Sequence, residues 1–145
     1  LSGEEFARTK DGQDNTFKAP ISLNRLDWEK AWENKELVRY YQGLIALRKQ
    51  IPGLCDKSEN SYKHIIDIWK EKDVVGFTVL NDEVARWSRI KIIYNAGESS
   101  YKEEISGDSW EILSDANDSW CWEKGICAER EIEAVPQSVL ILGCK

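Results

Sequence analysis

The chain has 145 residues with a formal net charge of −6, and 41% of them are hydrophobic. That size suits one ordinary domain, or a small domain with an appendage. With only three Pro and nine Gly, the composition excludes a disordered or fibrous chain. No apolar run approaches the roughly 20 residues that a membrane-spanning helix needs, so no membrane partner is expected. Nucleic acid is not expected either, because phosphate backbones demand a cationic face.

Two features of the sequence suggest that information is missing at its start. It contains no Met, and the opening residues LSGEEF lack the basic start and apolar centre of a signal peptide. We therefore expect the chain to be a fragment of a longer protein.

The cysteines leave two interpretations open. Cys121 and Cys127 are separated by five residues, unlike the spacing of zinc knuckles, while Cys55 and Cys144 stand apart. A disulfide across a loop is one interpretation; four free thiols, some packed as small apolar groups, is the favoured one. Free thiols favour a cytoplasmic location over a secreted one. The single histidine, His64, completes no recognisable ligand spacing, so we predict neither a metal nor a cofactor.

The first half of the chain changes from polar loop to helix. Residues 1–35 are polar and rich in turn formers, and Asp27 before Trp28 is typical of a helix cap. From residue 36 to 51 apolar side chains recur at steps of three and four, which predicts a helix with one buried face. The stripe consists of Leu37, Tyr41, Leu44, Leu47 and Ile51. Pro52-Gly53 is expected to stop this helix.

After about residue 57 the periodicity changes to that of strands. Short segments rich in β-branched and aromatic residues are separated by turn clusters, which predicts a mainly β fold, an antiparallel β-sandwich. The expected strands are Ile65–Trp69, Val74–Leu80, Ile90–Tyr94, Trp110–Leu113, Ala128–Val135 and Ser138–Leu142. In the fifth of these, Glu129, Glu131 and Glu133 fall on one strand face, which is most simply its solvated face.

The residues by themselves identify no catalytic group. A lone histidine makes a nucleophilic triad improbable, and neither of the glycine-rich phosphate motifs occurs. Paired carboxylates could hydrolyse a glycosidic bond, but no carboxylate has the apolar surroundings that raise the pKa of a general acid.

Seven Trp residues offer a binding role instead. Trp69 and Trp110 lie within strand patterns and are expected in the core. Trp120 and Trp122 flank a cysteine in a polar loop and would share one face if that loop is extended. They are candidates for stacking on sugar rings, which makes a non-catalytic carbohydrate-binding module, or a purely structural β-sandwich, the alternative function.

Several stretches resemble one enzyme family. The sequences GEEFARTK (3–10), DNTF (14–17), NRLDW (24–28) and YYQGLIALRK (40–49), in that order, resemble bacterial type I pullulanases, debranching enzymes of the α-amylase superfamily. The tail EIEAVPQSVLIL (131–142) resembles the last two strands of that family's C-terminal sandwich. Residues 55–128 match only in pattern.

The resemblance implies a specific division of the chain. Residues 1–52 would be the last loop and closing helix of a (β/α)8 barrel, and residues 57–145 the C-terminal β-sandwich domain. The family hydrolyses α-1,6 branch linkages of pullulan, starch or glycogen with a nucleophilic Asp and an acid Glu, neither of which has a counterpart here. We therefore expect a hydrolase parent and a fragment that is inactive alone, its sandwich stabilising the barrel.

The resemblance also nominates binding residues and partners. Arg8, Asp14 and Asn15 lie in the loop after the last barrel strand and are expected near substrate; holding the loop is the structural alternative. The expected partners are an α-glucan for the parent enzyme and the missing N-terminal barrel of the same chain. A dimer through an exposed helix 36–51 is a further expectation.

Overall fold

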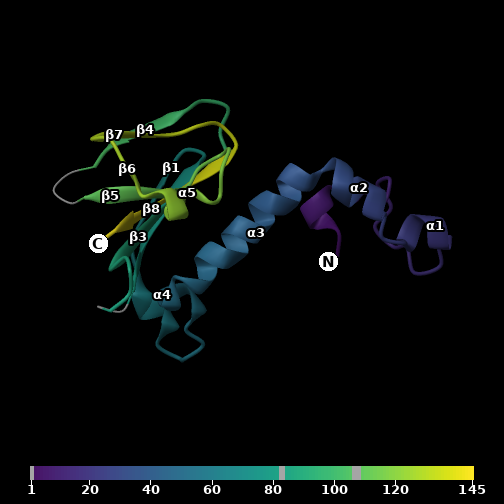
Figure 1. Cartoon of the computed structure of the whole chain (residues 1–145), viewed down its shortest axis with the longest axis horizontal. Helices are drawn as coiled ribbons and strands as arrows, with labels where there is room; N and C mark the ends of the chain where they lie inside the picture. Colours follow the sequence, from purple (N-terminus) through teal and green to yellow (C-terminus); the bar gives the residue numbers. More distant parts are fainter. Residues whose placement is uncertain (1, 82–83, 106–108) are drawn as a thin grey trace. The chain divides into compact units, whose positions relative to one another are not determined.

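The computed structural model describes residues 2–81, 84–105 and 109–145. The chain divides into two compact units, Leu1–Gln42 and Gly43–Lys145, with the boundary inside its longest helix. Figure 1 shows the order of the elements along the chain. Among the residues described, no helix has both the length and the apolar character needed to cross a bilayer.

The first unit consists of short helices joined by loops. These are the 3-10 helix η1 (Glu4–Phe6), α1 (Ile21–Asn24), α2 (Trp28–Glu33) and the first half of α3 (Lys35–Lys49). The Asp27 side chain accepts a hydrogen bond from the backbone N–H of Glu29 at 3.1 Å, which confirms Asp27 as the cap of α2. Among this unit's described residues, Phe6 is the only buried hydrophobic side chain.

The second half of α3 packs onto the sheet of the second unit. Leu47 and Ile51, from the predicted stripe, are 1% exposed and belong to a core cluster with side chains of that sheet. The predicted helix 36–51 is confirmed, although α3 ends at Lys49. Pro52 then begins the short helix α4 (Pro52–Cys55). Proline is tolerated at this position because the first N–H groups of a helix have no acceptor within the helix. Ile45 on α3 is 56% exposed, and a dimer through this helix stays a prediction.

The second unit is mainly β and antiparallel, as predicted. After the 3-10 helix η2 (Ser61–His64), six strands form one sheet in the order β1-β2-β3-β8-β5-β6, and β4 pairs with β7 in a second sheet (Figure 1). The large sheet contains β1 (Ile65–Glu71), β2 (Val74–Leu80), β3 (Arg89–Asn95), β8 (Ser138–Cys144), β5 (Trp110–Ser114) and β6 (Ile126–Cys127). The small sheet contains β4 (Tyr101–Glu104) and β7 (Glu131–Ala134), and a short helix, α5 (Cys121–Lys124), precedes β6.

Alternation along the strands creates two apolar cores, one on each face of the large sheet. One core joins the two sheets and includes Ile93, Trp110, Ile132 and Leu142; Trp69 packs against it. The other holds the end of α3 together with Val79, Trp87, Ile90 and Leu113. The period-2 pattern places neighbouring residues on opposite faces, which explains both cores. Trp110, 8% exposed, is thus a core residue, as expected, whereas Trp69 is half-buried and packs against this core.

Two strand expectations were wrong. The predicted strand Ala128–Val135 is shorter than expected: only Glu131–Ala134 forms a strand, β7, because residues 128–130 connect β6 of the large sheet to β7 of the small sheet. Strand β4, with the sequence YKEE, was not predicted because three of its four residues are polar. Glu131 and Glu133 are exposed on β7, in agreement with a solvated face.

The edge strand β1 carries an irregularity. Its pairing with β2 shifts register between Ile66 and Trp69, and Asp67 there adopts a left-handed backbone conformation with φ of 50°. These are the marks of a β-bulge, which bends a strand and interrupts its ladder of hydrogen bonds.

Candidate functional site

The loop predicted to lie near substrate is tied together by its own polar groups. The Arg8 guanidinium donates to the carbonyl oxygens of Asn24 and, at 3.2 Å, of Ser2. Lys10 Nζ donates to Thr16 Oγ1 at 2.6 Å, and the Asn24 amide donates to the Thr16 carbonyl oxygen at 2.7 Å. Because these bonds join residues 6 to 16 positions apart, they fix the shape of the loop.

The structure separates the three predicted loop residues. Arg8 is half-buried in this network, whereas Asp14 and Asn15 are exposed in the same segment. Sequence reasoning took Asn24 only as a turn former and part of a motif, and missed that it organises the loop. A substrate contact for Arg8, Asp14 and Asn15 stays a prediction.

Trp120 and Trp122 are brought together, but not by an extended segment. Trp120 caps α5, and the two rings stack with centroids 5.8 Å apart and planes at 24°. A Cβ at Gly43 would lie 2.8 Å from Trp120 Nε1, so α3 approaches this indole closely. Trp122 packs against the core beneath α3. Both rings are half-buried, and their role in sugar stacking stays a prediction.

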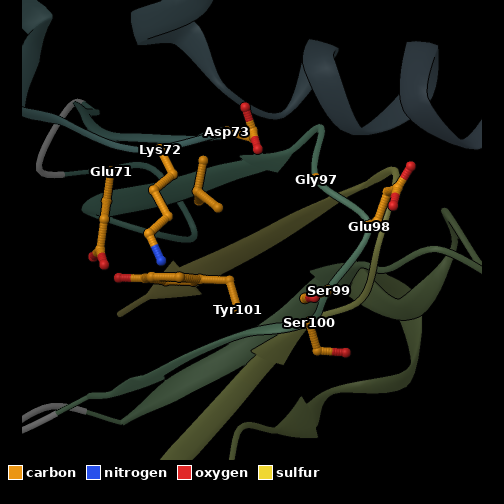
Figure 2. Close-up of a pocket in the computed structure, with 9 residues that line it drawn as sticks. Glu71, Lys72, Asp73, Gly97, Glu98, Ser99, Ser100 and Tyr101 are labelled. Atoms are coloured by element: carbon orange, nitrogen blue, oxygen red, sulfur yellow. The ribbon is translucent and has the colours of Figure 1, made fainter.

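A surface pocket of about 280 Å³ lies between two turns of the second unit (Figure 2). The β1–β2 turn contributes Glu71, Lys72 and Asp73, and the β3–β4 loop leads to Tyr101. Tyr101 is half-buried, with its ring centroid 5.2 Å from that of Trp69. Sequence reasoning missed this pocket because its walls come from turns more than 20 residues apart.

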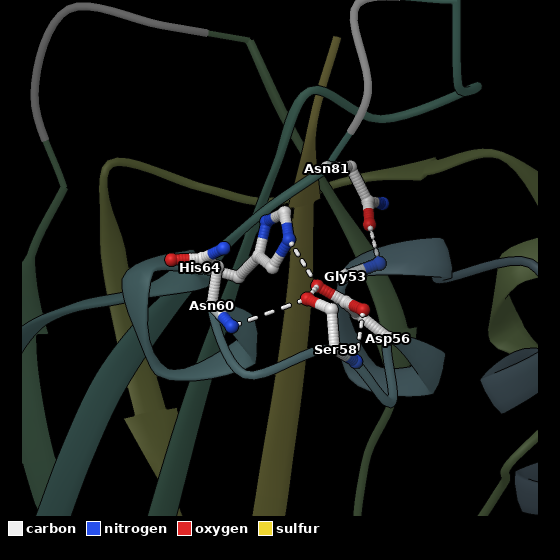
Figure 3. Close-up of polar contacts among 6 residues, drawn as sticks. All are labelled: Gly53, Asp56, Ser58, Asn60, His64 and Asn81. Atoms are coloured by element: carbon white, nitrogen blue, oxygen red, sulfur yellow. Dashed lines mark hydrogen bonds and ion pairs between the residues drawn. The ribbon is translucent and has the colours of Figure 1, made fainter.

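Serine, histidine and aspartate side chains also meet near α4, in an arrangement unlike that of a nucleophilic triad. Asp56 Oδ2 accepts from Ser58 Oγ at 2.9 Å and lies 3.0 Å from His64 Nε2 (Figure 3). In a triad the histidine bridges serine and carboxylate, whereas here Asp56 bridges the other two. The hydrogen bond from the backbone N–H of Ser58 is the main cause that lowers the pKa of Asp56. This cluster therefore fastens the link between α4 and β1.

Glu111 is the buried carboxylate of the sheet. Its Oε2 accepts from Trp87 Nε1 at 2.9 Å, Lys145 Nζ contacts Oε1, and Arg86 lies 3.8 Å away. The hydrogen bond from Lys145 is the largest cause lowering its pKa, followed among the lowering causes by that from Trp87. A glycosidase general acid needs a raised pKa, so the lowered pKa values of Asp56 and Glu111 give neither residue that role. Among the described residues no group of three or more His, Cys, Asp or Glu is placed to hold a metal.

Glu111 makes stability depend on pH. Because its pKa in the folded protein lies below its ordinary value of 4.5, its contribution is complete above that value and is lost as pH falls toward the folded pKa. We expect Glu111→Gln to be less stable than the parent at pH 7, and the difference to shrink below pH 4.5. Urea unfolding at a series of pH values measures it. A difference in unfolding free energy between Glu111→Gln and the parent that stays constant from pH 7 to pH 3 would contradict this role.

The chain is similar to known debranching enzymes, although no family model matches it. A pullulanase of Bacillus subtilis is 32% identical over 109 residues, which are 74% of this chain and 15% of that protein. A crystal structure of pullulanase type I from Bacillus subtilis, complexed with maltose, matches with a TM-score of 0.78 at 26% identity, over 98% of this chain and 20% of that chain. A pullulanase from Bacillus acidopullulyticus has a TM-score of 0.84 at 26% identity, over 97% of this chain and 18% of that one.

A second kind of relative matches a shorter stretch. A glycogen debranching enzyme of Salmonella typhi is 36% identical over 58 residues, 40% of this chain and 9% of that protein. The chain therefore resembles part of a pullulanase, and its β unit matches the C-terminal domains of such enzymes. It spans between 9% and 15% of the length of these two curated relatives.

Proposed function

We propose that the chain is the C-terminal part of a pullulanase-like debranching glycosidase that acts on α-1,6 linkages of an α-glucan. In this proposal residues 1–52 complete a (β/α)8 barrel, and residues 57–145 form a non-catalytic domain that stabilises it. The similarity to pullulanases over nearly the whole chain supports this assignment.

The observation that carries the proposal is the apolar surface of the first unit. Phe17, Ile21, Trp28 and Trp32 are 70–84% exposed, while Phe6 is the unit's only buried hydrophobic among the residues described. A segment with so little core of its own does not offset the conformational entropy lost on folding. Exposed apolar surface of this extent is typical of a face that other polypeptide covers. The remaining barrel of a pullulanase-like enzyme would supply that cover.

A chimera tests this function. The segment of Bacillus subtilis pullulanase that matches this chain is replaced by residues 1–145, and release of reducing sugar from pullulan is measured. We expect the chimera to hydrolyse pullulan and the 145-residue chain alone to release none. A soluble, folded chimera without activity, or turnover by the chain alone, would contradict the proposal.

The same chimera tests the loop residues. We propose that Arg8, Asp14 and Asn15 lie near substrate or support the loop, and the Arg8 hydrogen bonds favour support for that residue. Arg8→Ala with KM and kcat unchanged but a lower Tm identifies a supporting role. A raised KM for Asp14→Ala or Asn15→Ala, with Tm unchanged, identifies contact with the glucan.

A further inference from the structure

The pocket between the β1–β2 turn and the β3–β4 loop has walls that are held in place. The backbone N–H of Ala96 donates to the carbonyl oxygen of Asp73 at 3.0 Å and joins the two turns. Asn95, 2% exposed, fixes the loop: its Oδ1 accepts from the N–H of Gly97 and its Nδ2 donates to the carbonyl oxygen of Ser99, both at 2.9 Å. A site held in this way needs little ordering when it binds a ligand, which favours affinity.

The side chains in the pocket combine an aromatic ring with opposite charges. In Figure 2 the side chains of Glu71 and Lys72 extend from their turn toward the hydroxyl end of Tyr101. The ring supplies apolar surface, the carboxylate accepts hydrogen bonds, and the ammonium and phenol groups donate them. Burial, more than the nearby carboxylates Glu103 and Glu71, raises the pKa of Tyr101, so its hydroxyl stays protonated.

The charges of the pocket select the class of ligand. The lining residues include three carboxylates and a single cation, so the pocket carries net negative charge and repels an anion. The carboxylates are those of Glu71, Asp73 and Glu98, and the cation is Lys72. No set of three metal-ligating side chains stands there, since none occurs among the residues the structure describes. A neutral ligand with several hydroxyl groups can bind both the negative and the positive side chains of the pocket, because a hydroxyl group donates to a carboxylate and accepts from the ammonium or the phenol.

We propose that this pocket binds a short α-glucan, with Tyr101 contacting the sugar and Glu71 and Lys72 bonding adjacent hydroxyl groups. The choice of an α-glucan among neutral sugars rests on the proposed function. The volume of about 280 Å³ lies at the small end of the range for ligand pockets, which limits the site to a short sugar. The site would hold a glucan chain on the β domain without contributing to its cleavage.

Titration of the ¹⁵N-labelled chain with maltotriose, followed by NMR, tests the site. We expect saturable shifts of the backbone amides of residues 71–74 and 97–101. Glu71→Gln and Tyr101→Phe each remove one hydrogen-bonding group while preserving shape, and each should weaken binding about tenfold. Lys102→Gln is the matched control, because its side chain pairs with Glu131 and does not line the pocket; its binding should match the parent.

Each remaining outcome overturns the inference. In the first, the amide chemical shifts of residues 71–74 and 97–101 do not change during the titration. In the second, the shift changes are confined to residues 119–123 around Trp120 and Trp122. In the third, both pocket variants bind maltotriose as tightly as the parent chain does. The result is separable from that of the chimera. If the chimera hydrolyses pullulan but maltotriose does not bind at the pocket, only this inference is contradicted. If maltotriose binds at the pocket but the chimera is inactive, only the proposed function is contradicted.

Discussion

Replacement of Trp87 by alanine is expected to lower the free energy of unfolding of the sheet unit by about 3–5 kcal/mol, the range for large buried aromatics. Trp87 is fully buried, and a Cβ at Gly143 would lie 2.7 Å from its Cδ1, so the indole rests directly on β8. Its Nε1 donates to Glu111, and the Arg86 guanidinium lies 4.4 Å from the ring centroid. Truncation thus leaves a cavity and removes the hydrogen bond that Glu111 Oε2 accepts at 2.9 Å, with Arg86 at 3.8 Å as the remaining partner of that oxygen.

Urea unfolding followed by far-UV circular dichroism measures this loss. Trp32→Ala is the matched control, because Trp32 is 78% exposed, and it should change stability by less than about 0.5 kcal/mol. If Trp87→Ala fails to fold, Trp87→Phe still decides the matter, since it keeps a ring but removes the bond to Glu111. A loss below about 1 kcal/mol for either Trp87 variant would show that the indole does not anchor this core.

Asn95→Asp, which hardly alters the shape of the side chain, should destabilise the same unit by about 3 kcal/mol or more. Asn95 Nδ2 donates to the carbonyl oxygens of Ala134 at 2.9 Å, Val135 at 3.1 Å and Ser99 at 2.9 Å. A carboxylate there would place negative charge against three acceptors in a buried position. The pKa of the introduced carboxyl group should rise, so the variant should recover part of its stability as pH falls.

Thermal and urea unfolding at pH 7 and pH 5 test this expectation. Asn117→Asp makes the same chemical change at an exposed loop position and should be nearly neutral. An Asn95→Asp variant as stable as the Asn117→Asp control would mean that the three carbonyl groups find other donors. A variant equally unstable at both pH values would mean that the new charge is not the cause.

The sequence predicted the strands whose side chains are strongly apolar and failed where burial is weak. Val74–Leu80 and Ser138–Cys144 have apolar residues on both faces, so their periodicity identified them. Strand β4 has few apolar residues and depends on pairing with β7, which is a long-range contact. The strand predicted to begin at Ala128 begins only at Glu131, because the alternation of side chains seen in the sequence already starts within the connection from β6 to β7.

The candidate pocket was beyond sequence reasoning for a related reason. The turn around Asn95 to Gly97 is visible in the sequence, but its proximity to Lys72 and Asp73 follows from the pairing of β2 with β3. Tyr101 lies on the strand that was missed. A signal was present in the polar pair Lys72-Asp73 between two strand patterns, which is typical of a tight hairpin turn.

The bulge in β1 bears on how the protein behaves at high concentration. β1 lies at one edge of the large sheet, where exposed backbone groups would otherwise recruit a strand from a neighbouring molecule. The left-handed Asp67 and the register shift interrupt that template, and the charged side chain adds repulsion between copies. The opposite edge, β6, has only two residues. Both borders of the sheet therefore oppose the edge-to-edge polymerisation that leads to amyloid-like fibres.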